Sequence, residues 1–145
     1  MADSTTSLRY PRTARLLRPR DFAALRGASA HLGFRFVRCE YRVNDTPTAR
    51  LGMAVSRRVS KHAVVRNRIR RQIRESFRLQ RAHLPGCDVL VIARPLAAEQ
   101  NNHALRSELN ALWNKLAATI ALANQRAAQE AALNDAVPTG TMRGS

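Results

Sequence analysis

The amino-acid sequence predicts a single domain that contains both helices and strands. The chain has 145 residues, the usual length of one domain, which is enough to bury a core without a metal or a disulfide. One short and two long stretches place apolar residues at helical spacing, and three others alternate or run continuously, as strands do. Along the chain these stretches predict the order helix, strand, strand, helix, strand, helix.

The N-terminal part is predicted to be a flexible basic arm over residues 1–15, where three arginines surround Pro11 without sustained periodicity. This arm lacks the apolar core of a signal peptide, so we expect an untargeted, cytoplasmic protein. A short helix is expected over residues 22–25, because Pro19 suits a first helical turn and Gly27 suits a helix C-terminus.

Two strands are predicted next. Over residues 33–43 the side chains alternate, and one face receives Val37, Cys39, Tyr41 and Val43. The turn-forming residues 44–48 lead into a second strand over residues 50–57. One side of that strand carries only small residues, namely Gly52, Ala54 and Ser56. This side either packs tightly against a helix or lets a ligand approach the backbone, and we weigh the two alternatives equally.

Residues 57–81 predict a central helix, with Ser60 as its N-cap and an end near His83, before Pro85. One apolar stripe comprises Val65, Ile69, Ile73 and Phe77, and the opposite side gathers Arg70, Arg71, Arg74, Arg78 and Arg81. Residues 50–81 hold ten arginines and one lysine against one glutamate, so they carry +10 of the net charge of +15. Because these like charges repel, we expect a polyanionic partner.

The last part of the domain is predicted to be a strand followed by a helix. Residues 88–94, DVLVIAR, are almost continuously apolar, as in a strand covered on both faces. The order strand, helix, strand favours a parallel pair joined by a crossover. A last helix is expected over residues 102–126, with core positions Leu105, Leu109, Leu112, Trp113, Leu116 and Ile120. The domain should therefore span residues 16–122, followed by a disordered tail over residues 123–145.

The net charge leaves nucleic acid, an anionic membrane surface or an acidic protein as possible partners. Of the 25 basic residues 23 are arginines, whose planar fork binds phosphate bidentately, although a GC-rich genome would give the same bias. No apolar run approaches the roughly 18 residues that a membrane-spanning helix needs.

No catalytic or metal site is predicted within the protein. Cys39 and Cys87 lie far apart and lack the spacing of zinc ligands, so we expect both to be small buried hydrophobic residues. The four histidines are scattered, and the ten acidic residues occur singly. A nuclease that works without RNA would need a cluster of metal-binding carboxylates, which this pattern does not offer.

One family matches the residues of the central region. The sequence over residues 50–77 contains VSRR at 55–58, AVVRNRIRR at 63–71 and IRESF at 73–77. In this combination the chain closely resembles the protein subunit of bacterial ribonuclease P, whose hallmark is the RNR triplet, here Arg66, Asn67 and Arg68. The resemblance extends over roughly residues 15–118 and includes RPRDF at 18–22 and CDVLVIARP at 87–95.

This resemblance implies a compact α+β domain around a small mixed sheet, with a left-handed strand-helix-strand crossover, against the general right-handed rule. It also implies an accessory protein subunit. In the family a catalytic RNA holds the Mg²⁺ ions and removes the 5′ leader of precursor tRNA, while the protein binds that RNA and the leader. We therefore expect these two RNAs as partners, no membrane or DNA partner, and no cofactor on the protein itself.

The candidate site residues form two groups. The RNA-binding group comprises Arg57, Arg58, Lys61, Arg66, Asn67, Arg68, Arg70, Arg71 and Arg74. The candidates for the leader-binding cleft are Phe22, Phe34, Phe36, Cys39, Ala54 and Ser56. The phenylalanines are possible stacking platforms for unpaired bases, with core packing as the alternative. Because the family often has aromatic residues where this chain has Cys39 and residues 25–27, we expect its leader contacts to differ.

The main alternative function is a general basic RNA-binding or ribosome-associated protein, which would share the small size and the positive charge. Stimulation of precursor tRNA processing at low Mg²⁺ by the purified protein would separate the two functions.

Overall fold

A computed structural model describes residue 15 and residues 30–44 and 47–136 of the chain. The predicted arm, apart from Arg15, and the predicted first helix with Phe22 lie outside these residues. Among the described residues no helix is long and apolar enough to cross a membrane.

Four strands form one mixed sheet in the order β1-β2-β4-β3. The strands are β1 (Ala30–Gly33), β2 (Val37–Val43), β3 (Arg50–Ala54) and β4 (Cys87–Ala93). β2 is antiparallel to both β1 and β4, whereas β3 and β4 are parallel and are connected through helix α3 (Ala63–Gln80). The predicted parallel pair with a crossover helix, and the α+β class, are therefore confirmed.

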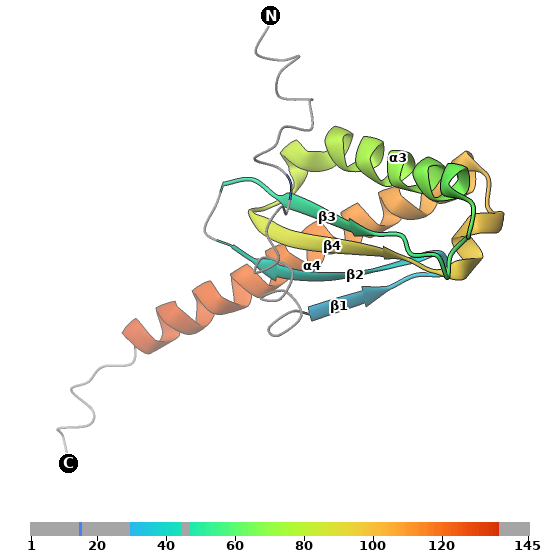
Figure 1. Cartoon of the computed structure of the whole chain (residues 1–145). Helices are drawn as coiled ribbons and strands as arrows, with labels where there is room; N and C mark the ends of the chain where they lie inside the picture. Colours follow the sequence, from blue (N-terminus) through green and yellow to red (C-terminus); the bar gives the residue numbers. More distant parts are fainter. Residues whose placement is uncertain (1–14, 16–29, 45–46, 137–145) are drawn as a thin grey trace, which may run out of the picture.

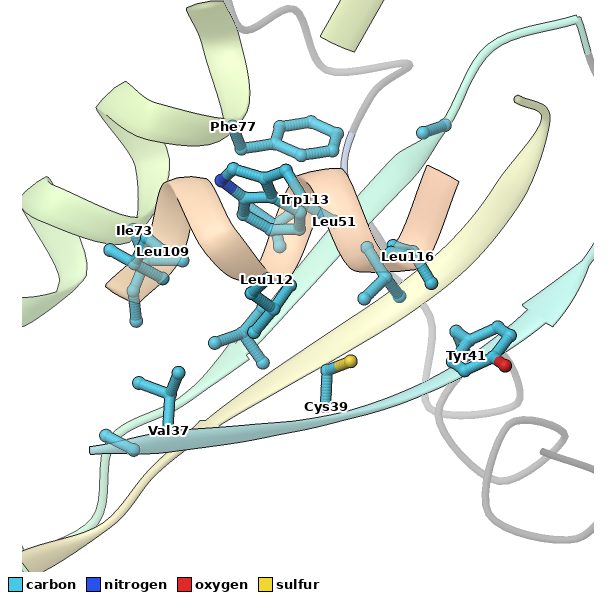
Figure 2. Close-up of a cluster of buried hydrophobic side chains, with 14 of the residues drawn as sticks. Val37, Cys39, Tyr41, Leu51, Ile73, Phe77, Leu109, Leu112, Trp113 and Leu116 are labelled. Carbon is cyan, nitrogen blue, oxygen red and sulfur yellow. The ribbon is translucent and has the colours of Figure 1, made fainter. Parts of the chain in front are cut away.

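Helices α3 and α4 (Asn102–Ala136) pack against the sheet (Figure 1). The predicted stripe of α3 is confirmed, because Ile69, Ile73 and Phe77 are buried and Val65 packs against the core. All six predicted core positions of α4 are also buried. Figure 2 shows side chains of both helices gathered above β2, with the rings of Phe77 and Trp113 in edge contact at 5.5 Å between centroids.

The predicted strand over residues 33–43 starts later in the structure, where its residues 37–43 form β2 and only Gly33 belongs to β1. β1 ends at Gly33, and a turn over residues 34–36 separates it from β2. The Phe34 N–H donates to the Val37 carbonyl across this turn, at 3.0 Å. The N–H groups of residues 35–37 donate to the carboxylate of Glu108 on α4, so a distant side chain replaces a strand partner.

The second predicted strand is shorter than expected, and the central helix starts later. β3 ends at Ala54, since residues 56–59 form a turn closed by the bond from Val59 N–H to the Ser56 carbonyl. Ser60 is not the N-cap, because α3 begins at Ala63 and the Ser60 hydroxyl accepts the N–H of His62, one residue before the helix. The helix continues past Gln80 as a single 3-10 turn, η2 (Arg81–His83), so its predicted end near His83 is confirmed.

The last helix is longer than predicted. It continues to Ala136, so residues 123–136, which were expected to belong to a disordered tail, are helical. Residues 121–134 are all exposed, which means that no core stabilises this part of the helix. Its alanine, glutamine, glutamate and leucine residues are strong helix formers, and this intrinsic preference accounts for the extension.

Both cysteines are free and buried, as predicted. Their side chains face the helices from β2 and β4, and burial raises the pKa of each thiol to about 12. Neither thiol therefore has the thiolate character of a reactive cysteine.

Candidate nucleic-acid interface

The basic residues of the predicted interface gather at the start of α3 and at the turn before it. In this turn, residues 56–59, the Val59 side chain is buried while Arg57 and Arg58 are exposed. The Ser56 hydroxyl accepts the N–H of Arg58 at 3.3 Å and helps to hold the turn. Because Val59 anchors the turn to the core, its two arginines extend into solvent beside the N-terminus of α3.

Three arginines near the start of α3 are half-buried and bond to backbone carbonyls. Arg66 donates to the Ser60 carbonyl at 2.8 Å, and Arg70 donates to the Val55 carbonyl at 3.1 Å. Arg68 donates to the Ala98 carbonyl at 3.3 Å and to the Asn102 side chain at 3.0 Å. The two arginines of the RNR triplet and Arg70 therefore hold the neighbouring loops while they contribute positive charge.

Arg70 and Arg81 also fix α3 against the edge of the sheet. The carbonyls of Val55 and Ala49, which flank β3, accept hydrogen bonds from Arg70 and Arg81 respectively. Arg81 bonds in addition to the hydroxyl of Thr48, at 3.0 Å. On the N-terminal side of the chain, Arg15 forms a parallel β-bridge with Leu51 of β3, so this residue of the predicted arm is held by the domain.

The side chains of five other predicted residues make no hydrogen bond or ion pair with any described residue, and we call them the free cations. They are Arg57, Arg58, Lys61, Arg71 and Arg74. Glu75, the single acid of residues 50–81, is paired with Arg78 at 2.9 Å, and this hydrogen bond holds the pKa of Glu75 below its usual range. The described ion pairs all use other basic residues, so none of them involves a free cation.

A hollow of about 350 Å³ lies beside these residues, where α3 meets the N-terminus of α4. It is lined by Val64, Asn67, Arg68, Arg71, Gln72 and Asn102. We call it the basic hollow. Val64, Gln72 and Asn102 were not among the predicted site residues, and Asn102 was predicted only as a helix start. Val64 is in fact 80% exposed.

The leader-binding candidates do not come together in one site. Cys39 is fully buried among core residues, so it is wrong as a contact, and its neighbours in β2 face the opposite side of the sheet. Phe34 and Phe36 lie together against the core and α4. Ala54 packs with Leu90 and Ile92 on the other face of the sheet. Ser56, two residues further along the chain, is exposed.

The buried acid Asp88 is used inside the fold. Asp88 is fully buried and accepts two bonds from Arg50, at 2.8 and 2.9 Å, and one from Asn44 at 2.6 Å. Burial alone would raise the pKa of Asp88, but the bonds from Arg50 and Asn44 outweigh it and hold the pKa below its usual value. Among the described residues no three His, Cys, Asp or Glu side chains are grouped to hold a metal ion.

Comparison with known proteins is decisive about the family. A sequence model of the family described as Ribonuclease P matches residues 10–117. The ribonuclease P protein component of Idiomarina loihiensis is 41% identical over 117 residues, covering 77% of this chain and 90% of that protein. The chain belongs to the ribonuclease P protein family. The component of Halorhodospira halophila is 43% identical over 106 residues, covering 72% of this chain and 87% of that protein.

Solved structures of the family share the fold. The RNase P protein of Staphylococcus aureus has a TM-score of 0.63 at 27% identity, covering 74% of this chain and 94% of that one. The RNase P protein of Thermotoga maritima also has a TM-score of 0.63, at 28% identity, with 70% and 96% covered. Like its family, the chain is the accessory protein subunit of an endoribonuclease of tRNA processing, and its partner is RNA.

Proposed function

We propose that this chain binds the catalytic RNA subunit of ribonuclease P and the 5′ leader of precursor tRNA, in the cytoplasm, and so assists removal of the leader. The observation that carries the proposal is the group of free cations before α3 and along it, none of which takes part in a described ion pair. Such a group binds phosphates and releases condensed counterions from RNA. The half-buried RNR arginines hold this surface in shape through the carbonyls of Ser60 and Ala98.

The chemistry of cleavage belongs to the RNA in this proposal. The chain supplies binding, positioning and charge neutralisation, and the Mg²⁺ ions are held by the catalytic RNA with no cofactor on the protein. Support comes from three acids of the fold, since Glu75, Asp88 and Glu108 are each occupied by arginine or backbone donors. Added positive charge should lower the Mg²⁺ concentration that the RNA needs to overcome its self-repulsion.

The leader should contact the face of the sheet that carries Ala54. This face is opposite α3 and α4, and the half-buried Ala54 lies on it at the end of β3, close to the exposed Ser56 and Arg57. A single strand lying there would reach the free cations at the end of β3 without passing through the core.

The proposal is tested by cleavage of precursor tRNA at limiting Mg²⁺ with the cognate catalytic RNA. The purified chain should stimulate cleavage, Arg71→Ala should reduce the stimulation, and Arg126→Ala should not. Arg126 is the matched control, because it is an exposed arginine on the distal part of α4. A general RNA-binding or ribosome-associated protein would bind RNA without stimulating cleavage, and cleavage by the protein alone would also refute the proposal.

A further inference from the structure

A second hollow, of about 560 Å³, lies between the turn over residues 34–36 and the first half of α4. Its lining includes Phe34, Arg35, Phe36, His103, Ser107 and Glu108, and we call it the aromatic hollow. The two rings are only partly buried, so each has a side against the core and a side toward the hollow. The basic residues used for the proposed function do not line it.

Glu108 fixes the turn that carries both rings. Its carboxylate accepts the N–H groups of Arg35, Phe36 and Val37, at 3.0, 2.7 and 3.0 Å. Three successive backbone donors form a site for one anionic group, which this carboxylate occupies. The positions of the rings are therefore set relative to α4, and the only acid of the hollow is already bound by donors of the protein.

A cation accompanies each ring. The ammonium of Lys115 lies 5.8 Å from the centroid of the Phe34 ring, and the guanidinium of Arg35 lies 5.5 Å from that of Phe36. Both cations lie over the ring faces and are exposed, so a base that stacks on a ring takes the place of the cation, which can then reach the phosphate. An aromatic platform beside a cation is the arrangement that stacks a base and holds its phosphate.

The aromatic hollow and the basic hollow are lined by neighbouring residues at the start of α4. Asn102 lines the basic hollow, and His103, the next residue of α4, lines the aromatic one. The two hollows therefore lie on either side of the first turn of α4, where the Asn101 side chain caps the N–H of Ala104 at 2.8 Å. An RNA that covers the start of α3 reaches the aromatic hollow across this one turn.

We infer that the aromatic hollow binds an unpaired nucleotide of the catalytic RNA, whose base stacks on Phe34 or Phe36. This inference rests on the proposed function, since it needs the same RNA on α3. It assigns the two rings to the catalytic RNA and not to the leader, because they lie on the side of the sheet that α4 covers and Ala54 lies on the other.

The test compares the affinity of the cognate catalytic RNA for the full chain and for Phe34→Leu and Phe36→Leu. Leucine keeps apolar packing against the core but removes the flat face. Loss of a stacked base should weaken binding by about 5- to 150-fold for at least one of the two variants. Val43→Ala, at the other end of β2, is the matched control with an exposed apolar side chain and should leave the affinity unchanged.

The source of the nucleotide is tested in the holoenzyme at saturating protein. Both leucine variants should then discriminate precursor from mature tRNA as well as the original chain does. Narrowed discrimination would show that the rings contact the leader and would overturn the inference. Unchanged affinity for the catalytic RNA in both variants would overturn it too, whereas failure of the original chain to bind that RNA would refute the proposed function itself.

A measurement on the original sequence guards against variants that fail to fold. With fluorinated phenylalanine incorporated, the fluorine resonances of Phe34 and Phe36 should shift when an unpaired oligoadenylate of about ten nucleotides is added. The resonance of Phe77, which is fully buried, should not move. An RNA duplex without unpaired bases should shift neither ring, and equal shifts with strand and duplex would contradict stacking.

Discussion

Replacing Arg71 by alanine should weaken the salt dependence of RNA binding without changing the stability of the domain. Arg71 is exposed and has no partner among the described residues, so its removal breaks no bond within them. Each phosphate contact contributes roughly 0.7 to 0.9 to the slope of log affinity against log salt. Five free cations should therefore give a slope of about −3.5 to −4.5, and a fourfold rise in salt should cost about 100- to 500-fold in affinity.

The assay is a titration of the catalytic RNA with the full chain at several salt concentrations, with a thermal melt of each variant. Arg71→Ala should make the slope shallower by about 0.7 to 0.9 and shift the free energy of unfolding by less than about 0.5 kcal/mol. Arg68→Ala should instead cost about 1 to 3 kcal/mol of stability, because it removes the bonds to Ala98 and Asn102. Arg126→Ala should change neither quantity.

Two results would refute this reasoning. A slope near −1 for the original chain would mean that the start of α3 is not the main electrostatic contact. Equal changes of slope for Arg71→Ala and Arg126→Ala would mean that net charge, and not the position of the free cations, determines affinity.

Other predictions concern stability. Ile73→Ala should cost about 2 to 5 kcal/mol in chemical denaturation by leaving a cavity, and a fully stable variant would show that the apolar face of α3 is misplaced. Asp88→Asn should cost about 1.5 to 3 kcal/mol at neutral pH, since a charged acceptor of Arg50 is lost. Folding lowers the pKa of Asp88, so the stability that its carboxylate contributes is complete above the ordinary pKa of the group and is lost as the pH falls through the lower pKa of the folded state. Denaturation at several pH values should show this loss of stability in the original chain and not in the variant. Ser76→Ala should cost about 1 to 3 kcal/mol in the same assay, because the buried indole N–H of Trp113 loses its acceptor. Removal of residues 121–145 should leave the affinity for RNA unchanged in the salt titration, since residues 121–134 are exposed and pack on no core.

The two faces of α3 illustrate how far periodicity carries a prediction. The spacing of Ile69, Ile73 and Phe77 predicted the buried face correctly, because a helix repeats every 3.6 residues whatever it packs against. From the same spacing, the arginines on the opposite face of the helix were predicted as one group. In the structure Arg70 and Arg81 bond to the residues that flank β3, whereas the side chains of Arg71 and Arg74 remain free. The spacing could not separate them, because the carbonyls that accept those bonds lie 15 and 32 residues away in sequence.

The sequence by itself determined the helices and strands with strong periodicity, the parallel β3–β4 pair, the concentration of charge at α3 and, through the RNR region, the family. Each of these depends on residues close together in the chain or on composition. Only the tertiary structure decided that Glu108 ends the first strand pattern, that Phe34 and Phe36 face α4, and that Ala54 lies on the other face of the sheet. These features depend on partners more than 70 residues away or on which face of a sheet a helix covers. Neither can be predicted from the local sequence.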